Sequence, residues 1–312
     1  MLHVDNLVKR YGKREALKGV SFHVNAGQIV GLLGENGAGK TTIMNIITGY
    51  LASDDGDVEI HGLNILDKPI EAKRMLGYLP EKPPLYEKMS VSEYLGFVGE
   101  LRGLEHLTIV REISELLKKL DMEKYRHTLI CQLSKGYKQR VGFAQALMGK
   151  PPLVILDEPM VGLDPNQIVE MRELIRSMAG GQTVILSSHI LSEIETICDK
   201  IIIIDDGRVV AEDTVKKLEE ENTENNILRV VVKGKKGDIH KILRETELVK
   251  RFQLLGEVEP GVYEFQVVTE SGTDVRDELF LLFAHNQMIV YSINTEQLSL
   301  EEVFRKVTNK EE

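Results

Sequence analysis

Cysteine is scarce in this chain: among 312 residues only Cys131 and Cys198 occur, without the spacing of metal ligands. A disulfide framework is therefore not expected, and a reducing cytosol is the natural compartment. Positive charge is also in deficit, with 39 Lys and Arg against 49 Asp and Glu and a formal net charge of −10. This balance argues against a general nucleic-acid binder, although binding a nucleotide needs only local positive potential.

Long hydrophobic runs are missing as well. The aliphatic runs Leu153–Leu156 and Ile201–Ile204 are far too short to span a bilayer, and they suit buried strands instead. The first 17 residues carry charges throughout, which does not fit a signal peptide. We therefore expect a protein that is soluble by itself, large enough for two domains, with any membrane role exercised through a partner.

The most informative stretch is Gly34–Thr42, which reads GENGAGKTT. It follows the short apolar run Ile29–Leu33 and precedes an apolar pattern of helical spacing that begins at Ile43. The order strand, glycine loop, helix fits G-x-x-x-x-G-K-[ST], the pattern of a phosphate-binding loop. A glycine-rich turn that binds nothing is the alternative, and the strand–helix context disfavours it.

The residue types of this loop suit phosphate chemistry. Glycines let successive backbone N–H groups turn toward a phosphate chain, and the following helix N-terminus adds partial positive charge. Lys40 is placed to reach the terminal phosphates. The Thr41 hydroxyl is placed to ligate Mg²⁺.

Ahead of the loop, residues 2–30 alternate between apolar and polar positions, which predicts short antiparallel strands. Tyr11 lies at a turn between them and could stack on an adenine ring. Taken alone, an exposed turn tyrosine is more often structural, so this interpretation depends on the motifs around it.

Two further strands end in polar residues of catalytic type. The run Leu153–Leu156 leads into Asp157 and Glu158, which can act as a metal-side aspartate and a water-polarising glutamate. A helix cap or a solvated loop would be the ordinary explanation of such a pair. The strand at 183–186 leads to His189, a candidate sensor of phosphate that alone would more often be structural.

Between these segments the periodicity turns helical from Val91 to Leu120, which predicts two or three helices. Ser134 is placed to cap another helix that begins near Lys135. The cap alone is the bland interpretation, but an exposed helix N-terminus with Ser134 and Gly136 is also a good phosphate site.

Taken in order, these motifs resemble the ATP-binding subunit of an ABC transporter over residues 1 to about 215. The segments that carry the resemblance are Gly34–Thr41 (Walker A), Leu133–Gln139 (signature), Val154–Asp157 (Walker B) and Gly162–Asp164 (D-loop). The resemblance implies that Glu158 is the catalytic glutamate, His189 the switch histidine and Tyr11 the adenine-stacking aromatic.

The chain departs from the family pattern at three positions. The signature is usually L-S-G-G-Q, and here Lys135 replaces the first glycine and Tyr137 replaces the glutamine. The lid segment usually carries glutamine where this chain has Glu81. A carboxylate there can approach Mg²⁺ or water, but it does not donate hydrogen bonds as an amide does.

The resemblance implies a homodimer, because the chain has one motif set and the family stacks two cassettes head to tail around ATP. Each ATP would lie between one Walker A loop and the partner's signature, with ATP and Mg²⁺ as cofactors. The expected catalytic residues are Lys40, Glu158 and His189, and the expected metal-side residues are Thr41, Glu81 and Asp157. The expected nucleotide-binding residues are Tyr11, Gly34, Glu35, Asn36, Gly37, Ala38, Gly39, Lys40, Thr41, Thr42, Ser134 and Gly136.

The predicted organisation is an α/β P-loop NTPase domain, 1–218, then a polar linker, 219–226, and a small α+β domain, 227–312. The first domain should contain an antiparallel β subdomain and a helical subdomain at about 88–150. The order βαββαβ in the last domain suggests a ferredoxin-like arrangement. This domain could regulate, dimerise or brace the ATPase, and bracing or dimerisation is the favoured interpretation. The phrase Leu298–Phe304 resembles the end of type-2 exporter ATPases, most like the gliding-motility and copper-site-maturation branch.

The implied function is to power a separate transmembrane permease of an export complex, peripherally on the inner face of the cell membrane, without binding nucleic acid. A groove near Glu81–Met89 would receive the permease. A soluble ABC ATPase acting on ribosomes or DNA is the alternative; the single motif set and the acidic balance disfavour it. A non-catalytic scaffold is disfavoured by the intact Lys40, Asp157, Glu158 and His189.

Overall fold

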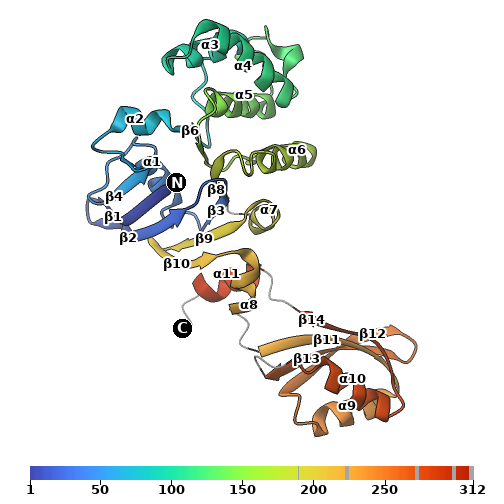
Figure 1. Cartoon of the computed structure of the whole chain (residues 1–312). Helices are drawn as coiled ribbons and strands as arrows, with labels where there is room; N and C mark the ends of the chain where they lie inside the picture. Colours follow the sequence, from blue (N-terminus) through green and yellow to red (C-terminus); the bar gives the residue numbers. More distant parts are fainter. Residues whose placement is uncertain (189, 222–224, 271–273, 297–299, 309–312) are drawn as a thin grey trace. The chain divides into compact units, whose positions relative to one another are not determined.

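The computed structural model describes residues 1–188, 190–221, 225–270, 274–296 and 300–308 (Figure 1). The chain forms two compact units, Met1–Val215 and Lys216–Glu311. Each unit contains a hydrophobic core cluster of its own. No helix in the described ranges is long and apolar enough to cross a membrane.

The first unit begins with a four-stranded antiparallel sheet in the order β2-β1-β4-β5. Its strands are β1 (Leu2–Tyr11), β2 (Arg14–Val24), β4 (Asp55–Ile60) and β5 (Leu63–Asn64). Apolar and polar residues alternate along β1 and β2, so one face packs inward and the other faces solvent. The sheet includes the antiparallel strands that this alternation predicted.

A six-stranded sheet forms the centre of the first unit, in the order β10-β9-β3-β8-β7-β6. Its strands are β3 (Ile29–Leu33), β6 (Leu76–Leu79), β7 (Leu153–Leu156), β8 (Thr183–Ser188), β9 (Lys200–Asp205) and β10 (Arg208–Asp213). All neighbours are parallel except β9 and β10. Because β3, β8 and β7 are adjacent and parallel, the segments after them meet at one edge of the sheet.

Helices surround this sheet and build a separate layer beyond it (Figure 1). The helices near the sheet are α1 (Lys40–Ile47), α2 (Pro69–Arg74), α6 (Pro165–Arg176) and α7 (Leu191–Ile197). The helical layer contains α3 (Val91–Leu101), α4 (His106–Lys119), α5 (Lys135–Leu147) and the 3₁₀ turns η1 (Glu123–Tyr125) and η2 (Ile130–Gln132). All five lie within the range predicted for a helical subdomain.

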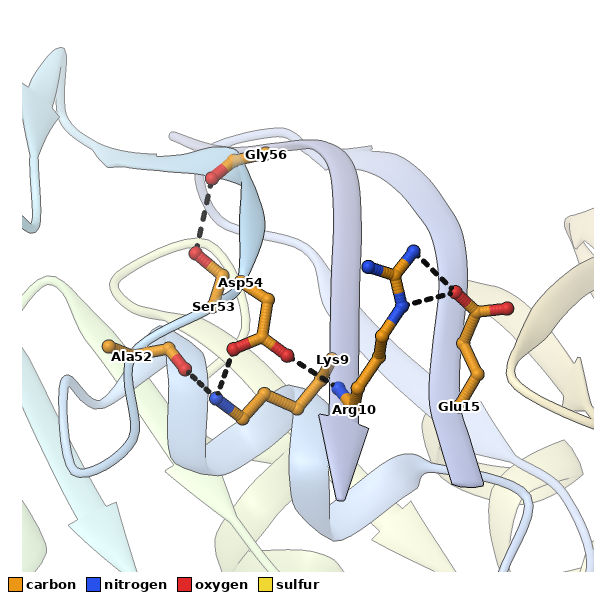
Figure 2. A network of polar contacts seen from close by, with 7 residues as sticks. All are labelled: Lys9, Arg10, Glu15, Ala52, Ser53, Asp54 and Gly56. Atoms are coloured by element: carbon orange, nitrogen blue, oxygen red, sulfur yellow. Dashed lines mark hydrogen bonds and ion pairs between the residues drawn. The ribbon is translucent and has the colours of Figure 1, made fainter. Parts of the chain in front are cut away.

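A polar network ties β1 to the segment before β4 (Figure 2). Lys9 donates to Asp54 at 2.8 Å and to the Ala52 carbonyl at 2.7 Å, and the Arg10 backbone N–H donates to Asp54 at 2.6 Å. The hydrogen bonds from the Lys9 side chain and the Arg10 backbone lower the pKa of the Asp54 carboxyl. The network holds the end of β1, which carries Tyr11.

The second unit is built on a four-stranded antiparallel sheet in the order β12-β13-β11-β14. In chain order its elements are β11 (Asn225–Lys233), α9 (Lys236–Glu245), β12 (Arg251–Glu259), β13 (Val262–Glu270), α10 (Arg276–His285) and β14 (Ile289–Glu296). This order and pairing is the ferredoxin-like arrangement that βαββαβ suggested. Phe265 and Phe283 are fully buried in its core, which α9 and α10 close on one face (Figure 1).

The structure differs from the predicted linker at 219–226. Helix α8 (Val215–Glu221) takes up 219–221, and β11 begins at Asn225. The run of glutamates after Leu218 continues a helix, because Glu is a good helix former. A last helix, α11 (Leu300–Thr308), follows β14; positions 298 and 299 of the exporter-like phrase lie outside the described residues.

Candidate nucleotide-binding site

The glycine loop joins β3 to α1, as the sequence predicted. Gly39 precedes α1 with a φ of 116°, a conformation that L side chains rarely adopt. A Cβ on Gly34 would lie 2.4 Å from the Ile204 carbonyl oxygen, so a larger residue does not fit there. Ala38 is buried, whereas the backbone from Glu35 to Gly37 forms the exposed mouth of the loop.

Lys40 crosses this loop. Its Nζ donates to the carbonyl oxygens of Gly34 at 2.6 Å and Glu35 at 3.2 Å. Burial lowers the pKa of the Lys40 amine, and the charges of Glu158 and Asp157 oppose that effect. The ammonium group therefore lies near the predicted catalytic carboxylates and is held by two backbone carbonyls.

Asp157 follows β7 and is almost fully buried. It accepts a 2.6 Å hydrogen bond from the Ser187 hydroxyl, and the same hydroxyl accepts a bond from the Glu158 N–H at 2.9 Å. Burial raises the pKa of the Asp157 carboxyl most, and the charges of Glu158 and Glu81 add to this. The Ser187 bond and Lys40 lower it. Ser187 thus connects the Asp157 carboxylate and the Glu158 backbone to β8.

Glu158 has a φ of 48°, in the left-handed region that is uncommon for residues other than glycine. This conformation turns the chain sharply directly after Asp157. Strain of this kind persists where the surrounding structure enforces it, and it is concentrated at functional sites. Here the Ser187 hydroxyl fixes the Glu158 N–H.

The β1–β2 hairpin forms the wall beside the loop. Tyr11 ends β1, is half exposed, and is paired with Arg14 across the turn. Arg14 donates to the Gly37 carbonyl at 3.4 Å. Sequence reasoning did not identify Arg14 or Ser187. The sequence feature that could have identified Arg14 is its position three residues after Tyr11, which places it opposite Tyr11 across a two-residue turn.

The signature segment starts α5. Ser134 is the N-cap residue by position, but its side chain makes no capping hydrogen bond, so the hydroxyl is not committed to the predicted cap. Gly136 is buried, and a Cβ there would lie 2.4 Å from Oε1 of Gln167. Gln167 belongs to the capping box of Asp164 at the start of α6, so the signature packs against the D-loop region.

Two departures from the family pattern have local contacts. A Cβ on Gly162 would lie 1.9 Å from Nζ of Lys135, so the Lys135 ammonium lies directly over the D-loop glycine. The Tyr137 ring lies 4.3 Å from the ring of Tyr125, with the Arg140 guanidinium over its face at 5.5 Å. Tyr137 therefore packs within the helical layer.

The structure brings Lys40, Asp157, Glu158 and the glycine loop together, with Glu81 close enough to influence Asp157. No hydrogen bond within the described chain joins Ser134 or Gly136 to this loop. In the described ranges no three His, Cys, Asp or Glu residues are spaced to hold a metal. His189 lies outside the described residues.

The glycine loop lies between a central parallel strand and a helix, and a buried Asp157 with a half-buried Glu158 follows β7, the second strand along the sheet. This arrangement defines a P-loop NTPase of the ATP-binding cassette class. The ABC transporter family model matches residues 17–161.

Relatives and solved structures agree with this class. The linearmycin resistance ATP-binding protein LnrL of Bacillus subtilis is 36% identical over 75% of this chain and 76% of its own length. The ABC transporter ATP-binding protein YcbN of the same organism is 33% identical over 99% of this chain and 97% of its own length. A dimeric ATP-binding cassette in a post-hydrolysis state, bound to ADP and phosphate, shares 25% identity over 69% of this chain and 98% of its own, with a TM-score of 0.63. This chain belongs to the family of ABC transporter ATP-binding proteins, and it is an ATPase.

Proposed function

We propose that this protein hydrolyses ATP to power a separate transmembrane permease of an export complex. The observation that carries the proposal is that no hydrogen bond in the described chain joins the signature residues to the glycine loop. Lys40, Asp157 and Glu158 surround the glycine loop, while Ser134 and Gly136 make no hydrogen bond to the loop of their own chain. A second copy, arranged head to tail, would supply them.

In this arrangement the loop from Gly34 to Thr42 binds the phosphates, and Tyr11 stacks on the adenine. The Lys40 ammonium exchanges the carbonyls of Gly34 and Glu35 for phosphate oxygens. Glu158 polarises the attacking water, and His189 orients Glu158 and the γ-phosphate. Ser134 and Gly136 of the partner close on the γ-phosphate, so positioning and charge stabilisation supply most of the catalysis.

The donor set near the loop fits Mg²⁺. A hydroxyl from Thr41 and the carboxylate of Asp157 offer the oxygen ligands that Mg²⁺ takes together with phosphates and water. When bound, Mg²⁺ would neutralise phosphate charge.

A groove of about 1150 Å³ in the first unit supports a permease partner. Its lining combines strongly exposed apolar side chains, among them Tyr50, Ile70 and Leu101 at 84, 67 and 72% exposure, with the cations Lys73 and Arg102. Large exposed apolar groups mark interaction surfaces. The groove includes residues of the predicted Glu81–Met89 segment and suits a helix with apolar and acidic side chains.

The site is tested by Glu158→Gln. We expect steady-state ATP turnover to fall about a hundredfold or more, because the water loses its polarising carboxylate. ATP binding should remain, and the variant should accumulate as an ATP-bound dimer in size-exclusion chromatography. Turnover at the wild-type level would contradict the assignment of Glu158.

The partner is tested by affinity purification from membranes. We expect the wild-type chain to retain a membrane protein, and Leu101→Asp to lose it, because an aspartate would place charge in the apolar groove. Circular dichroism checks that the variant is folded. Copurification with ribosomes and no membrane protein would support the alternative function. The same result would refute a peripheral location at the inner face of the membrane.

A further inference from the structure

The two charged departures from the family pattern line one pocket. A pocket of about 320 Å³ lies between the lid segment (residues 80–89) and the start of α5, with Glu81 on one side and Lys135 on the other. The usual family pattern has uncharged residues at both places, glutamine and glycine. In this chain an acid, Glu81, and a base, Lys135, stand at these two places and line the same pocket.

Five charged residues line this pocket: Glu81, Lys82, Glu87, Lys135 and Lys138. Lys82 belongs to the lid segment itself, so it cannot join that segment to α5. Lys138, one turn along α5, forms an ion pair of 2.6 Å with Glu87 of the lid segment. The side chains of Glu81 and Lys135 make no hydrogen bond or ion pair with any residue that the structure describes. The lid segment and α5 are thus joined by one salt bridge, Lys138–Glu87. Glu81 and Lys135 have the charges needed for a second.

We propose that Glu81 and Lys135 form an ion pair when the nucleotide site closes, and that this pair couples the lid to the signature helix of the same subunit. The proposal rests on the proposed ATPase function. In the structure the Lys135 ammonium lies over Gly162. Its flexible four-carbon stem allows it to leave that position and reach across the pocket. Lys135 is then a positioning residue, since it acts through Glu81.

A double-mutant cycle tests the coupling. Lys135→Gln should lower kcat about fivefold in the wild-type chain but less than twofold in a Glu81→Gln chain, because that chain has no carboxylate at position 81 to pair with. The matched control combines Glu81→Gln with Lys138→Ala, whose effects should multiply. If Lys135→Gln were equally harmful with Glu or Gln at position 81, the proposal would be overturned.

A carbodiimide cross-link tests the contact without relying on turnover. In the Glu158→Gln protein with Mg-ATP, a carboxylate and an amine in contact are joined as an amide, and peptide mass spectrometry identifies the pair. We expect the Glu81–Lys135 link with ATP and little of it without, while the Glu87–Lys138 link forms in both states. Formation of the Glu87–Lys138 link without the Glu81–Lys135 link in the presence of ATP would overturn the proposal.

Failure of the proposed function is distinguishable from failure of this inference. A wild-type protein that does not hydrolyse ATP, or that binds ATP no better than Lys40→Ala, would refute the function. A hydrolysing wild type with multiplicative Glu81 and Lys135 effects would refute only the ion pair.

Discussion

Arg14 contacts the nucleotide site from a position that no motif marks. It lies opposite Tyr11 in the β1–β2 pairing, and its guanidinium reaches the Gly37 carbonyl over 3.4 Å. Arg14 therefore stands between the expected adenine position and the phosphate loop. A guanidinium in this place can donate several hydrogen bonds to phosphate oxygens.

We expect Arg14→Ala to weaken ATP and ADP binding about tenfold, as loss of a charged hydrogen bond to phosphate would. Titration with a fluorescent nucleotide analogue measures the change in Kd. Lys13→Ala is the matched control, because it removes the same charge from the adjacent turn position. Equal losses in both variants would mean that only the general positive potential matters.

At the level of elements, the Asp54 network stabilises the end of β1, with Lys9 and the Arg10 backbone as donors (Figure 2). The pKa of Asp54 is lowered in the folded protein, chiefly by the Lys9 hydrogen bond. A carboxylate with a lowered folded pKa contributes stability above its unfolded pKa and loses it as the pH falls through the folded value.

Asp54→Asn should therefore lower the Tm at neutral pH, and the difference from wild type should shrink below about pH 4. Thermal unfolding between pH 3 and 7 measures this. Asp67→Asn, which removes an exposed aspartate charge elsewhere in the same unit, is the control. A difference that stayed constant across this range would contradict the ionic role of Asp54.

At the level of the whole molecule, the two units have separate core clusters, one around the β sheets of Met1–Val215 and one around Phe265 and Phe283. Domains with their own cores fold independently. We expect a fragment of residues 1–215 to unfold cooperatively and to bind ATP with a Kd within about twofold of the full chain. Calorimetry and nucleotide titration test this. A fragment that is unfolded would show that the second unit completes the first.

The elements were largely predictable because their patterns are local. Alternation along β1 and β2, the short buried runs of β3 and β7, and the βαββαβ order of the second unit each follow from residue spacing within a few positions. The structure of the segment 219–226 was less predictable, since its polar residues suit a linker and a helix equally. In the structure, helix α8 includes residues 219–221.

The site shows the same division. The sequence by itself determined the phosphate loop, because only glycine satisfies the φ of 116° at position 39 and the lack of space at Gly34. It also determined the Asp157–Glu158 pair and the family. Only the tertiary structure decided which residues surround them. Ser187 reaches the site because β8 lies between β3 and β7, and Arg14 reaches it because the β1–β2 hairpin lies beside the glycine loop. Glu81 and Lys135 share a pocket because the lid segment and α5 pack together. Contacts of that range depend on how strands and helices are arranged in space, which local residue patterns do not encode.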